Sequence, residues 1–468
     1  MDKYKRLMSN TMLFAISTFS SKVLSFFLTS YHTHIMGTES YGAINVVIYI
    51  GNLLIPVVSL GISNAVIRYG IQKGISKKAV YTNGIIATFM GFLLLLALTP
   101  LLSIIPFIGG NVQGYWPLLL VFVLVSCLRT LNCQIVRAKE AVRLYAFDGI
   151  LATATNLGFN ILFLSGFEIR PDGILLATIC SDACSTVFLF CVSKLWRYID
   201  FRKINRPLFK KMLVYSLPLI PTSVFWWVTN VSDQLFVTHY WGDGATGIYA
   251  ASYKIPTLIS IVATLFTEAW QLSAFTDGQE KGREEFFTKV FGAYQGLMFL
   301  AGGGLILLCK PIMTVFVSSA YFEGWRYIPV LIAAMIFSSL NNYLNSIYML
   351  MQKSKMSLYT MALGAISNIL LNWLLIPRVG VMGAAVATFI SYLLVFIVRV
   401  YSTHKLIAME YSGLRLAVNL AAVVLESLIV LLELKLWWLW SAILCAVILV
   451  INFGALWNTV MKLLRRKA

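Results

Sequence analysis

The sequence has few charged residues, few histidines and no closely spaced cysteine pair. Charged residues make up 12% of the 468-residue chain, whereas soluble globular proteins have about 25%. The four histidines form no HExxH pattern and the seven cysteines form no CxxC pair, so neither a metal site nor a redox site is indicated. We expect the cysteines to be buried free thiols. No P-loop, GxGxxG or catalytic-triad pattern is found, and no catalytic residue is predicted.

The chain is instead rich in apolar residues. They make up 59% of it, and the mean hydropathy is +0.80. Apolar runs of about 20 residues recur along the whole length, which predicts an all-α integral membrane protein with about fourteen transmembrane helices. The predicted spans are 9–32, 41–66, 80–105, 115–136, 144–166, 173–195, 212–238, 247–270, 287–309, 327–351, 357–376, 382–402, 413–432 and 437–459.

The basic residues are divided unequally between the two predicted sides of the membrane. The chain has 37 lysines and arginines and a net charge of +18. Most lie in loops on one side, whereas the loops of the other side hold only Arg170, Arg326, Arg378 and Lys435. This bias predicts that both termini are cytoplasmic, and it explains the charge by topology rather than by nucleic-acid binding. The first apolar run continues to about Met36 with no small-residue cleavage site, which predicts no cleavable signal peptide.

Two halves of the chain resemble each other. THIMGTESYG (33–42) aligns with THYWGDGATG (238–247), and DGILLAT (172–178) aligns with MGAAVAT (382–388). A repeat of six spans keeps the orientation of the chain, so we predict two six-helix lobes related by a parallel pseudo-two-fold axis. The predicted parts are an N-terminal lobe (1–196), a basic cytoplasmic linker (197–211), a C-terminal lobe (212–404), and two further helices with a basic tail (405–468).

Several ionisable residues fall inside predicted spans, where an isolated charge is costly and usually functional. The cations are Lys22, Arg129 and Lys254, with Arg68 near a span end, and the acids are Asp182, Asp233 and Glu268. Cations in a wet cavity suit an anionic head group such as a diphosphate. Pairing of these charges with one another, for example Lys22 with Asp182 or Asp233, is the structural alternative. The acids balance the charge of the cavity or carry a coupling proton or sodium ion; the sequence leaves this open.

The chain resembles the polysaccharide-transport family, the Wzx-type flippases, of the multidrug/oligosaccharidyl-lipid/polysaccharide exporter superfamily. The residues that carry the resemblance are SNTMLFAISTFSSKVLSFFLTSYHTHIMGTESYG, VVSLGISNAVIRYG, YSLPLIPTSVFWWVTNVSDQLFVTHYWGDGATGIYAASYKIP and PRVGVMGAAVATFISY. The resemblance implies a flippase of the bacterial inner or plasma membrane. Its substrate would be a polyisoprenyl-diphosphate-linked oligosaccharide, moved to the outer leaflet for cell-surface polysaccharide assembly beside a polymerase and chain-length machinery.

The same resemblance implies roles for the charged residues. Lys22, Arg129 and Lys254 become candidate diphosphate ligands, and Arg68 a residue met by the substrate on its way in. No cofactor is implied beyond coupling to a proton or sodium gradient. The alternatives are a multidrug or cation exporter or a lipid II flippase of the same superfamily. A membrane polymerase or ligase needs a large outer loop, which the sequence lacks, so an enzyme is not predicted.

Overall fold

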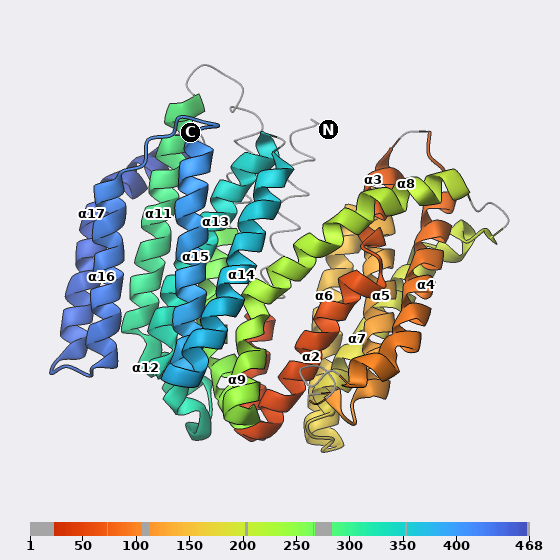
Figure 1. The fold of residues 1–468 in the computed structure, drawn as a ribbon, viewed down its shortest axis with the longest axis horizontal. Helices are drawn as coiled ribbons and strands as arrows, with labels where there is room; N and C mark the ends of the chain where they lie inside the picture. The colour runs from red at the N-terminus through yellow and green to blue at the C-terminus, as the bar shows by residue number, and fades with distance from the viewer. Residues whose placement is uncertain are drawn as a thin grey trace. The chain divides into compact units, whose positions relative to one another are not determined.

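The computed structural model describes residues 23–465, except 73, 105–109, 111, 202–204, 265, 267–282 and 352. All regular elements of these residues are helices (Figure 1). The chain forms two compact units, Met1–Trp227 and Val228–Ala468. Twelve described helices are long and apolar enough to cross a membrane. The chain is therefore a multi-pass helical membrane protein, as the sequence predicts.

The first unit is built from long helices with short connections. Residues 23–35 are helical, and a 3₁₀ turn (η3, Leu195–Tyr198) precedes the linker. The remaining helices are α2 (Thr38–Val58), α3 (Ile62–Ile71), α4 (Lys77–Ile104), α5 (Trp116–Ala138), α6 (Val142–Ile161), α7 (Gly173–Val192) and α8 (Arg206–Ser216).

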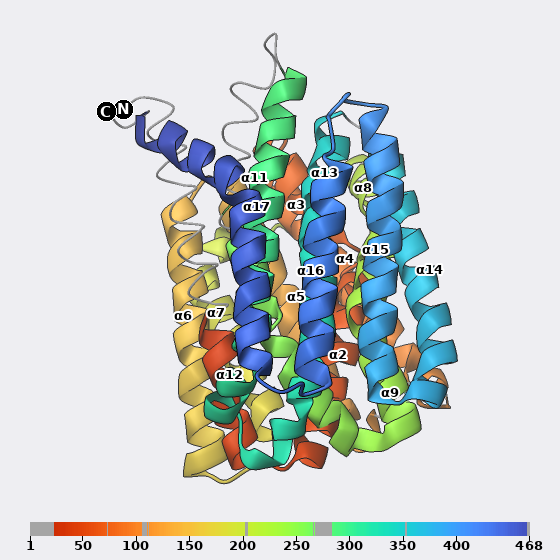
Figure 2. The same cartoon turned by 90° about the vertical axis from the view of Figure 1, so that its left-hand side faces the viewer.

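The second unit begins within a long helix, α9 (Ile220–Lys254), which continues from the first unit. Its last two helices, α16 and α17, pack against α11 (Figures 1 and 2). The remaining helices are α11 (Arg283–Leu307), α12 (Cys309–Phe316), α13 (Ile328–Leu350), α14 (Ser354–Val379), α15 (Val381–His404), α16 (Gly413–Leu431) and α17 (Trp437–Arg465), with a 3₁₀ helix η6 (Ser319–Arg326).

A glycine lies at the break between two predicted spans. The segment α9 contains most of span 212–238 and the start of span 247–270, and its backbone is non-helical between them at Gly242, with φ 80° and ψ 175°. A side chain disfavours this conformation, and glycine does not. Prolines lie at both ends of α9: a 3₁₀ turn containing Pro218 separates α8 from α9, and α9 ends at Lys254, just before Pro256. The first predicted span lies partly outside the described residues.

Matching hydrogen bonds in the two units support the internal repeat. In α6, Asn160 donates to the side chain of Asn156 (3.1 Å), and in α14 Asn372 donates to the side chain of Asn368 (3.0 Å). Each pair also bonds to the first helix of its own unit: His32 contacts Asn160 at 2.7 Å, and Ser232 donates to Asn368 at 2.7 Å. Each unit thus holds an inward-facing asparagine pair at its fifth predicted span.

The helices of the first unit approach closely at glycines. A Cβ on Gly91 of α4 would lie 1.8 Å from the backbone oxygen of Val58 in α2, so only glycine allows this crossing. The seven cysteines are free, as expected. The expectation that they are all buried is wrong, because Cys184 and Cys191 are exposed on α7. An apolar sequence run predicts a membrane helix but not which of its faces meets lipid.

Candidate functional site

In the first unit, the predicted cation Arg129 pairs with the predicted acid Asp182. Arg129 Nη1 lies 2.8 Å from Asp182 Oδ1, joining α5 to α7. The other carboxylate oxygen of Asp182 accepts from Ser126 at 2.5 Å. Charge-assisted bonds of this kind are among the strongest in proteins. Arg129 and Asp182, which the sequence gives as separate candidates, thus form one ion pair. The sequence analysis gives a different partner for Asp182, Lys22, as its structural alternative.

A second acid, Asp148 of α6, belongs to the same polar network. Arg129 Nε donates to Ser185 at 3.1 Å, and Ser185 donates to Asp148 at 2.6 Å. Ser185 is fully buried and Asp148 nearly so. The guanidinium of Arg129 thus uses two of its five N–H donors, one on Nη1 for Asp182 and one on Nε for Ser185. The positive charge of Arg129 therefore faces two carboxyl groups, so Arg129 is a compensated cation whose remaining donors are available to a ligand.

In the second unit, Asp233 of α9 lies in a buried network without a described cation. Its carboxylate accepts from the Tyr249 hydroxyl (2.7 Å), the Gln234 amide (2.9 Å) and, at 3.4 Å, the Thr388 hydroxyl of α15. Only 1% of the residue is exposed. Among the described residues, no lysine or arginine pairs with it. A buried carboxylate without a counter-ion is costly, so this site favours a proton or a bound cation.

Oxygen atoms dominate the neighbourhood of this carboxyl. Ser232, next to Asp233, donates to Asn368, and Asn368 Nδ2 lies 3.4 Å from Thr388. The side-chain oxygens of Asn372 and Gln234 are buried and accept no hydrogen bond. Hard cations such as sodium prefer oxygen ligands. No cluster of three His, Cys, Asp or Glu residues is found in the described part of the chain, so a single carboxyl suits a proton or a monovalent ion.

Lys254 is the last residue of α9. Its side chain is half-buried, and the ammonium group has no hydrogen bond or ion pair within the described ranges. The backbone turns at residues 255–256, and helix resumes at 257. A lysine inside a membrane span with no partner is expected to face water or a ligand. Of the two described cations predicted within the spans, Arg129 and Lys254, Lys254 is therefore the one without a described ion-pair partner.

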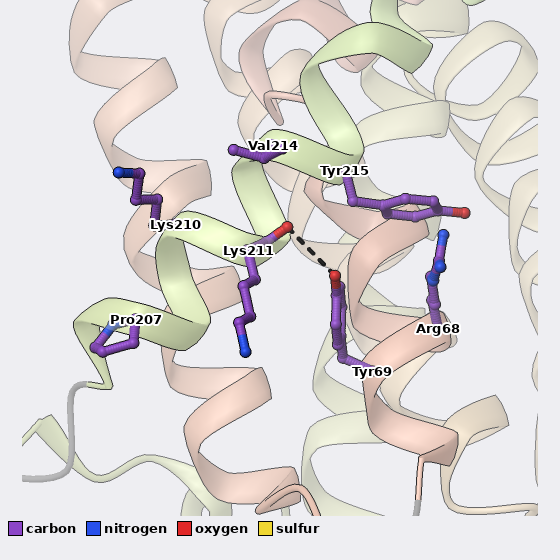
Figure 3. A pocket seen from close by; sticks show the side chains of 7 residues that line it. All are labelled: Arg68, Tyr69, Pro207, Lys210, Lys211, Val214 and Tyr215. Atoms are coloured by element: carbon purple, nitrogen blue, oxygen red, sulfur yellow. Dashed lines mark hydrogen bonds between the residues drawn. The ribbon is translucent and has the colours of Figure 1, made fainter.

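Arg68 lies in a pocket of about 620 Å³ between α3 and α8 (Figure 3). Its guanidinium stacks over the Tyr215 ring, 4.1 Å from the centroid, and lies 5.9 Å from the Tyr69 centroid. The Tyr69 hydroxyl donates to the backbone oxygen of Lys211 at 3.4 Å, linking the two helices. The lining residues are Arg68, Tyr69, Pro207, Lys210, Lys211, Val214 and Tyr215. Sequence reasoning placed Arg68 alone at this end of a span; the structure adds two lysines.

The segment that leads into α8 is anchored to the rest of the first unit. Thr82 of α4 donates to the backbone oxygen of Tyr198 and accepts from the amide of Asp200. The Asn205 side chain caps α8 by accepting from the amide of Leu208 at 2.9 Å. Leu208 and Met212 are buried in the same core cluster as α3. The described residues of the predicted basic linker are therefore anchored to the first unit and partly helical.

Sequence reasoning missed one buried cation. The sequence analysis did not name Arg399 among the cations inside the spans, but this residue lies in α15 and is only 4% exposed. Its guanidinium donates to the Asn341 backbone oxygen (2.7 Å) and the Thr360 hydroxyl (3.0 Å), fastening α15 to α13 and α14. Its place near a span end resembles that of the loop cations, so no sequence signal distinguished it. Two predicted site residues, Lys22 and Glu268, lie outside the described residues.

The chain is similar to known proteins in both sequence and fold. The model of the family described as "Polysaccharide biosynthesis protein" matches residues 7–270. A protein of the Lsg locus of Haemophilus influenzae is 25% identical over 56% of this chain and 65% of its own length. An uncharacterized membrane protein of Methanocaldococcus jannaschii is 22% identical over 44% of this chain and 50% of its own. The matches thus span half to just under two thirds of these relatives.

Solved structures share the fold at lower identity. The lipid II flippase MurJ in an inward closed conformation has a TM-score of 0.73 and 16% identity, covering 96% of this chain and all of that one. An inward-facing multidrug resistance MATE family transporter of the MOP superfamily has a TM-score of 0.66 and 14% identity, covering 87% of this chain and 98% of that one. The fold and the family match agree with the sequence resemblance. The chain belongs to the family described as "Polysaccharide biosynthesis protein".

Proposed function

We propose that the chain is a flippase that moves a polyisoprenyl-diphosphate-linked oligosaccharide from the cytoplasmic to the outer leaflet by alternating access. The family match over residues 7–270 carries this proposal, because it ties a chain of membrane-length helices to polysaccharide assembly. We place the protein in a bacterial inner or plasma membrane with both termini in the cytoplasm, where its basic loops would lie. A polysaccharide polymerase and chain-length machinery would act on the exported glycan.

The proposed mechanism uses charge and makes or breaks no bond. Lys254, whose ammonium has no described partner, would neutralise the diphosphate, together with the unused donors of Arg129. Lys22, the third predicted cation, would serve the same end. Neutralising the head group lowers the cost of carrying it through the low-dielectric membrane. The prenyl chain would stay in the lipid.

Asp233 is our candidate for coupling to an ion gradient. Its isolated, oxygen-rich surroundings suit a proton or a sodium ion. An ion can bias the equilibrium between two states only through different affinities for them. Transport driven by an imposed proton gradient in sodium-free buffer would favour the proton, and transport that needs sodium would favour the cation. Asp233→Asn should abolish the dependence in either case; unchanged dependence would exclude this residue.

Vesicles provide the direct test. The protein is reconstituted with a polyprenyl-diphosphate oligosaccharide, and exposure of the glycan on the far leaflet is measured with a lectin. We expect transport by the wild type, loss in Lys254→Ala and partial recovery in Lys254→Arg. Lys355→Ala removes an equal charge from an exposed residue at the start of α14 and serves as the control. Equal transport by all four proteins would contradict the role of Lys254, and absence of transport in all of them would contradict the substrate.

A cation exporter is the second candidate, favoured by the buried acid Asp233, which has no described cation beside it. Such a protein would extrude cationic dyes from the same vesicles and would depend on Asp233 but not on Lys254. A lipid II flippase is a third, close in chemistry, because its substrate also carries a diphosphate. Supplying lipid II in place of the oligosaccharide carrier distinguishes it.

A further inference from the structure

The last two helices hold a buried acid that the proposed function does not use. Helices α16 and α17 pack against α11 (Figure 2), and Glu426 of α16 lies at this junction with none of its surface exposed. Its Oε1 accepts from the Ser441 hydroxyl of α17 at 2.5 Å. Its Oε2 is buried and has no hydrogen-bond partner. The carboxyl group therefore has a single, neutral partner.

The unpartnered oxygen of Glu426 faces a glycine, an apolar group and a thiol. A Cβ added to Gly303 of α11 would lie 3.2 Å from Oε2, 3.3 Å from Ile448 Cδ1 and 3.8 Å from Cys445 Sγ. Because that Cβ position is only one bond length from the glycine backbone, Oε2 and the backbone are too close for a water molecule or an ion to lie between them. The glycine thus lets α11 pack directly against the carboxyl group.

No described positive charge balances Glu426. Arg415, the other charged residue of α16, bonds to oxygens about three turns away, and Lys310 of α12 pairs with Glu433 instead. The charged residues of α11 all lie in its first seven positions, α13 has none, and α17 has none before Lys462. The other titratable groups near the carboxyl are thiols, those of Cys309 and Cys445. A thiol is neutral or negative, so it cannot balance a carboxylate.

A proton suits this site and a metal ion does not. An isolated carboxylate buried among apolar groups is very costly, and such a group takes up a proton instead. A sodium ion prefers several oxygen ligands, whereas the only described side-chain oxygen bonded to Glu426 is that of Ser441. The acid form keeps this bond, because a hydroxyl can donate or accept. It leaves Oε2 as a neutral carbonyl oxygen, which costs less to bury than a charge.

We propose that Glu426 is a proton-binding site and that its proton holds the α16–α17 pair against α11. In the acid form the carboxyl group packs beside Gly303 without a buried charge. Loss of the proton would leave an unpaired charge among the three helices, which water reaches only if the helices separate. The site differs from that of Asp233, whose oxygen-rich surroundings also admit a metal ion, and it lies outside the two predicted six-helix lobes.

Infrared spectroscopy of the full chain in liposomes detects the proton directly, because a protonated carboxyl group and a carboxylate absorb at different frequencies. We expect Glu426→Gln to lose one protonated-carboxyl band at neutral pH. Glu433→Gln is the matched control: it removes an exposed, ion-paired acid from the turn between the same two helices and should lose a carboxylate band. Loss of a carboxylate band in Glu426→Gln would overturn the proposed proton site.

The contribution of the proton to packing is measured by thermal unfolding. The folded chain holds a proton on Glu426 that the unfolded chain releases, so the stability of the wild type falls as the pH rises. Relative to Glu426→Gln, which cannot ionise, the melting temperature of the wild type should fall by roughly a few degrees between about pH 6 and about pH 9. Glu433→Gln should keep the wild-type pH dependence in this range.

Glu426→Met, an apolar side chain of similar length, gives a second test of the packing role. It should remove the same infrared band and the same pH dependence as Glu426→Gln. If wild type, Glu426→Gln and Glu426→Met all share one pH dependence, the proton does not hold the helices together. Both measurements use the protein without a carrier lipid or an ion gradient, so their results are independent of the flippase function.

Discussion

Separating Arg129 from Asp182 should destabilise the protein, and the structure indicates by how much. The Arg129 side chain is 30% exposed and that of Asp182 is 10% exposed. Removing one partner of a fully buried ion pair costs about 3–5 kcal/mol. Partial exposure of Arg129 lowers this, so we expect a loss of about 2–3 kcal/mol for Asp182→Asn, and a similar loss for Arg129→Gln. The double variant should lose less than the sum, by about 1–2 kcal/mol.

The assay is thermal unfolding of the purified protein in detergent, followed by tryptophan fluorescence. A loss of about 1 kcal/mol lowers the melting temperature by roughly 2–4 °C in chains of 150–250 residues, and by less in longer ones. The melting temperatures of the single variants should therefore be several degrees lower than that of the wild type. The control is Glu285→Gln, which breaks the exposed pair with Lys289 on α11 and should shift the free energy by less than about 0.5 kcal/mol. Additive effects of the two single variants would refute a direct Arg129–Asp182 pair.

Transport then distinguishes the two roles of Arg129. If the pair only holds α5 against α7, Arg129→Gln and Asp182→Asn, which lose similar stability, should lose transport to a similar degree. If Arg129 also binds the substrate, Arg129→Gln should lose far more transport than Asp182→Asn.

Three further predictions concern single contacts. Lys310 of α12 donates to Glu433 (2.5 Å), which lies in the turn between α16 and α17, and holds the pKa of that carboxyl below its usual value. This contact stabilises above the usual pKa of about 4.3 and is lost as the pH falls further, so the melting temperatures of wild type and Glu433→Gln should differ at pH 7 and converge by about pH 3. Gly91→Ala should abolish folded protein in size-exclusion chromatography, because its Cβ would lie 1.8 Å from a backbone oxygen, whereas Gly158→Ala, with nothing within 4 Å, should elute normally. Asn452→Ala should cost about 2 kcal/mol in thermal unfolding, since this buried amide joins α17 to α16 by several hydrogen bonds; an unchanged melting temperature would show that these bonds are not formed.

The helices were predictable because a span needs an apolar run of defined length. The effects of Pro218 and Pro256 were predictable too, since proline lacks an amide hydrogen. The break between spans 212–238 and 247–270 was predicted, and Gly242 lies within it, but the glycine in the sequence did not reveal its φ angle. The exposure of Cys184 and Cys191 was not predicted either, because hydropathy says nothing about which face of a helix meets lipid.

The site was predicted as a set of residues rather than as an arrangement. The sequence identified Arg129 and Asp182 but could not pair them, because pairing depends on how α5 and α7 are rotated about their axes. The α3–α8 pocket was invisible for a similar reason: Arg68 and Lys210 are far apart in sequence and line one pocket only because α8 packs on α3. Arg399 was not recognised as a buried cation, because a buried arginine near a span end has the same sequence context as a loop arginine.

The turn at Gly242 has a consequence for how the protein is made. A continuous helix of 35 residues would extend for about 52 Å, well beyond the roughly 30 Å apolar layer of a bilayer. The chain turns within a few residues at Gly242. Two hydrogen bonds span this turn: the Thr238 and Thr246 hydroxyls bond to each other at 2.7 Å, and Thr246 donates to the Gly242 backbone oxygen at 3.1 Å. Only a short turn separates the two helical parts of α9, so the insertion machinery has to insert both parts together as a helical hairpin. An error at this single turn would invert every span synthesised after it.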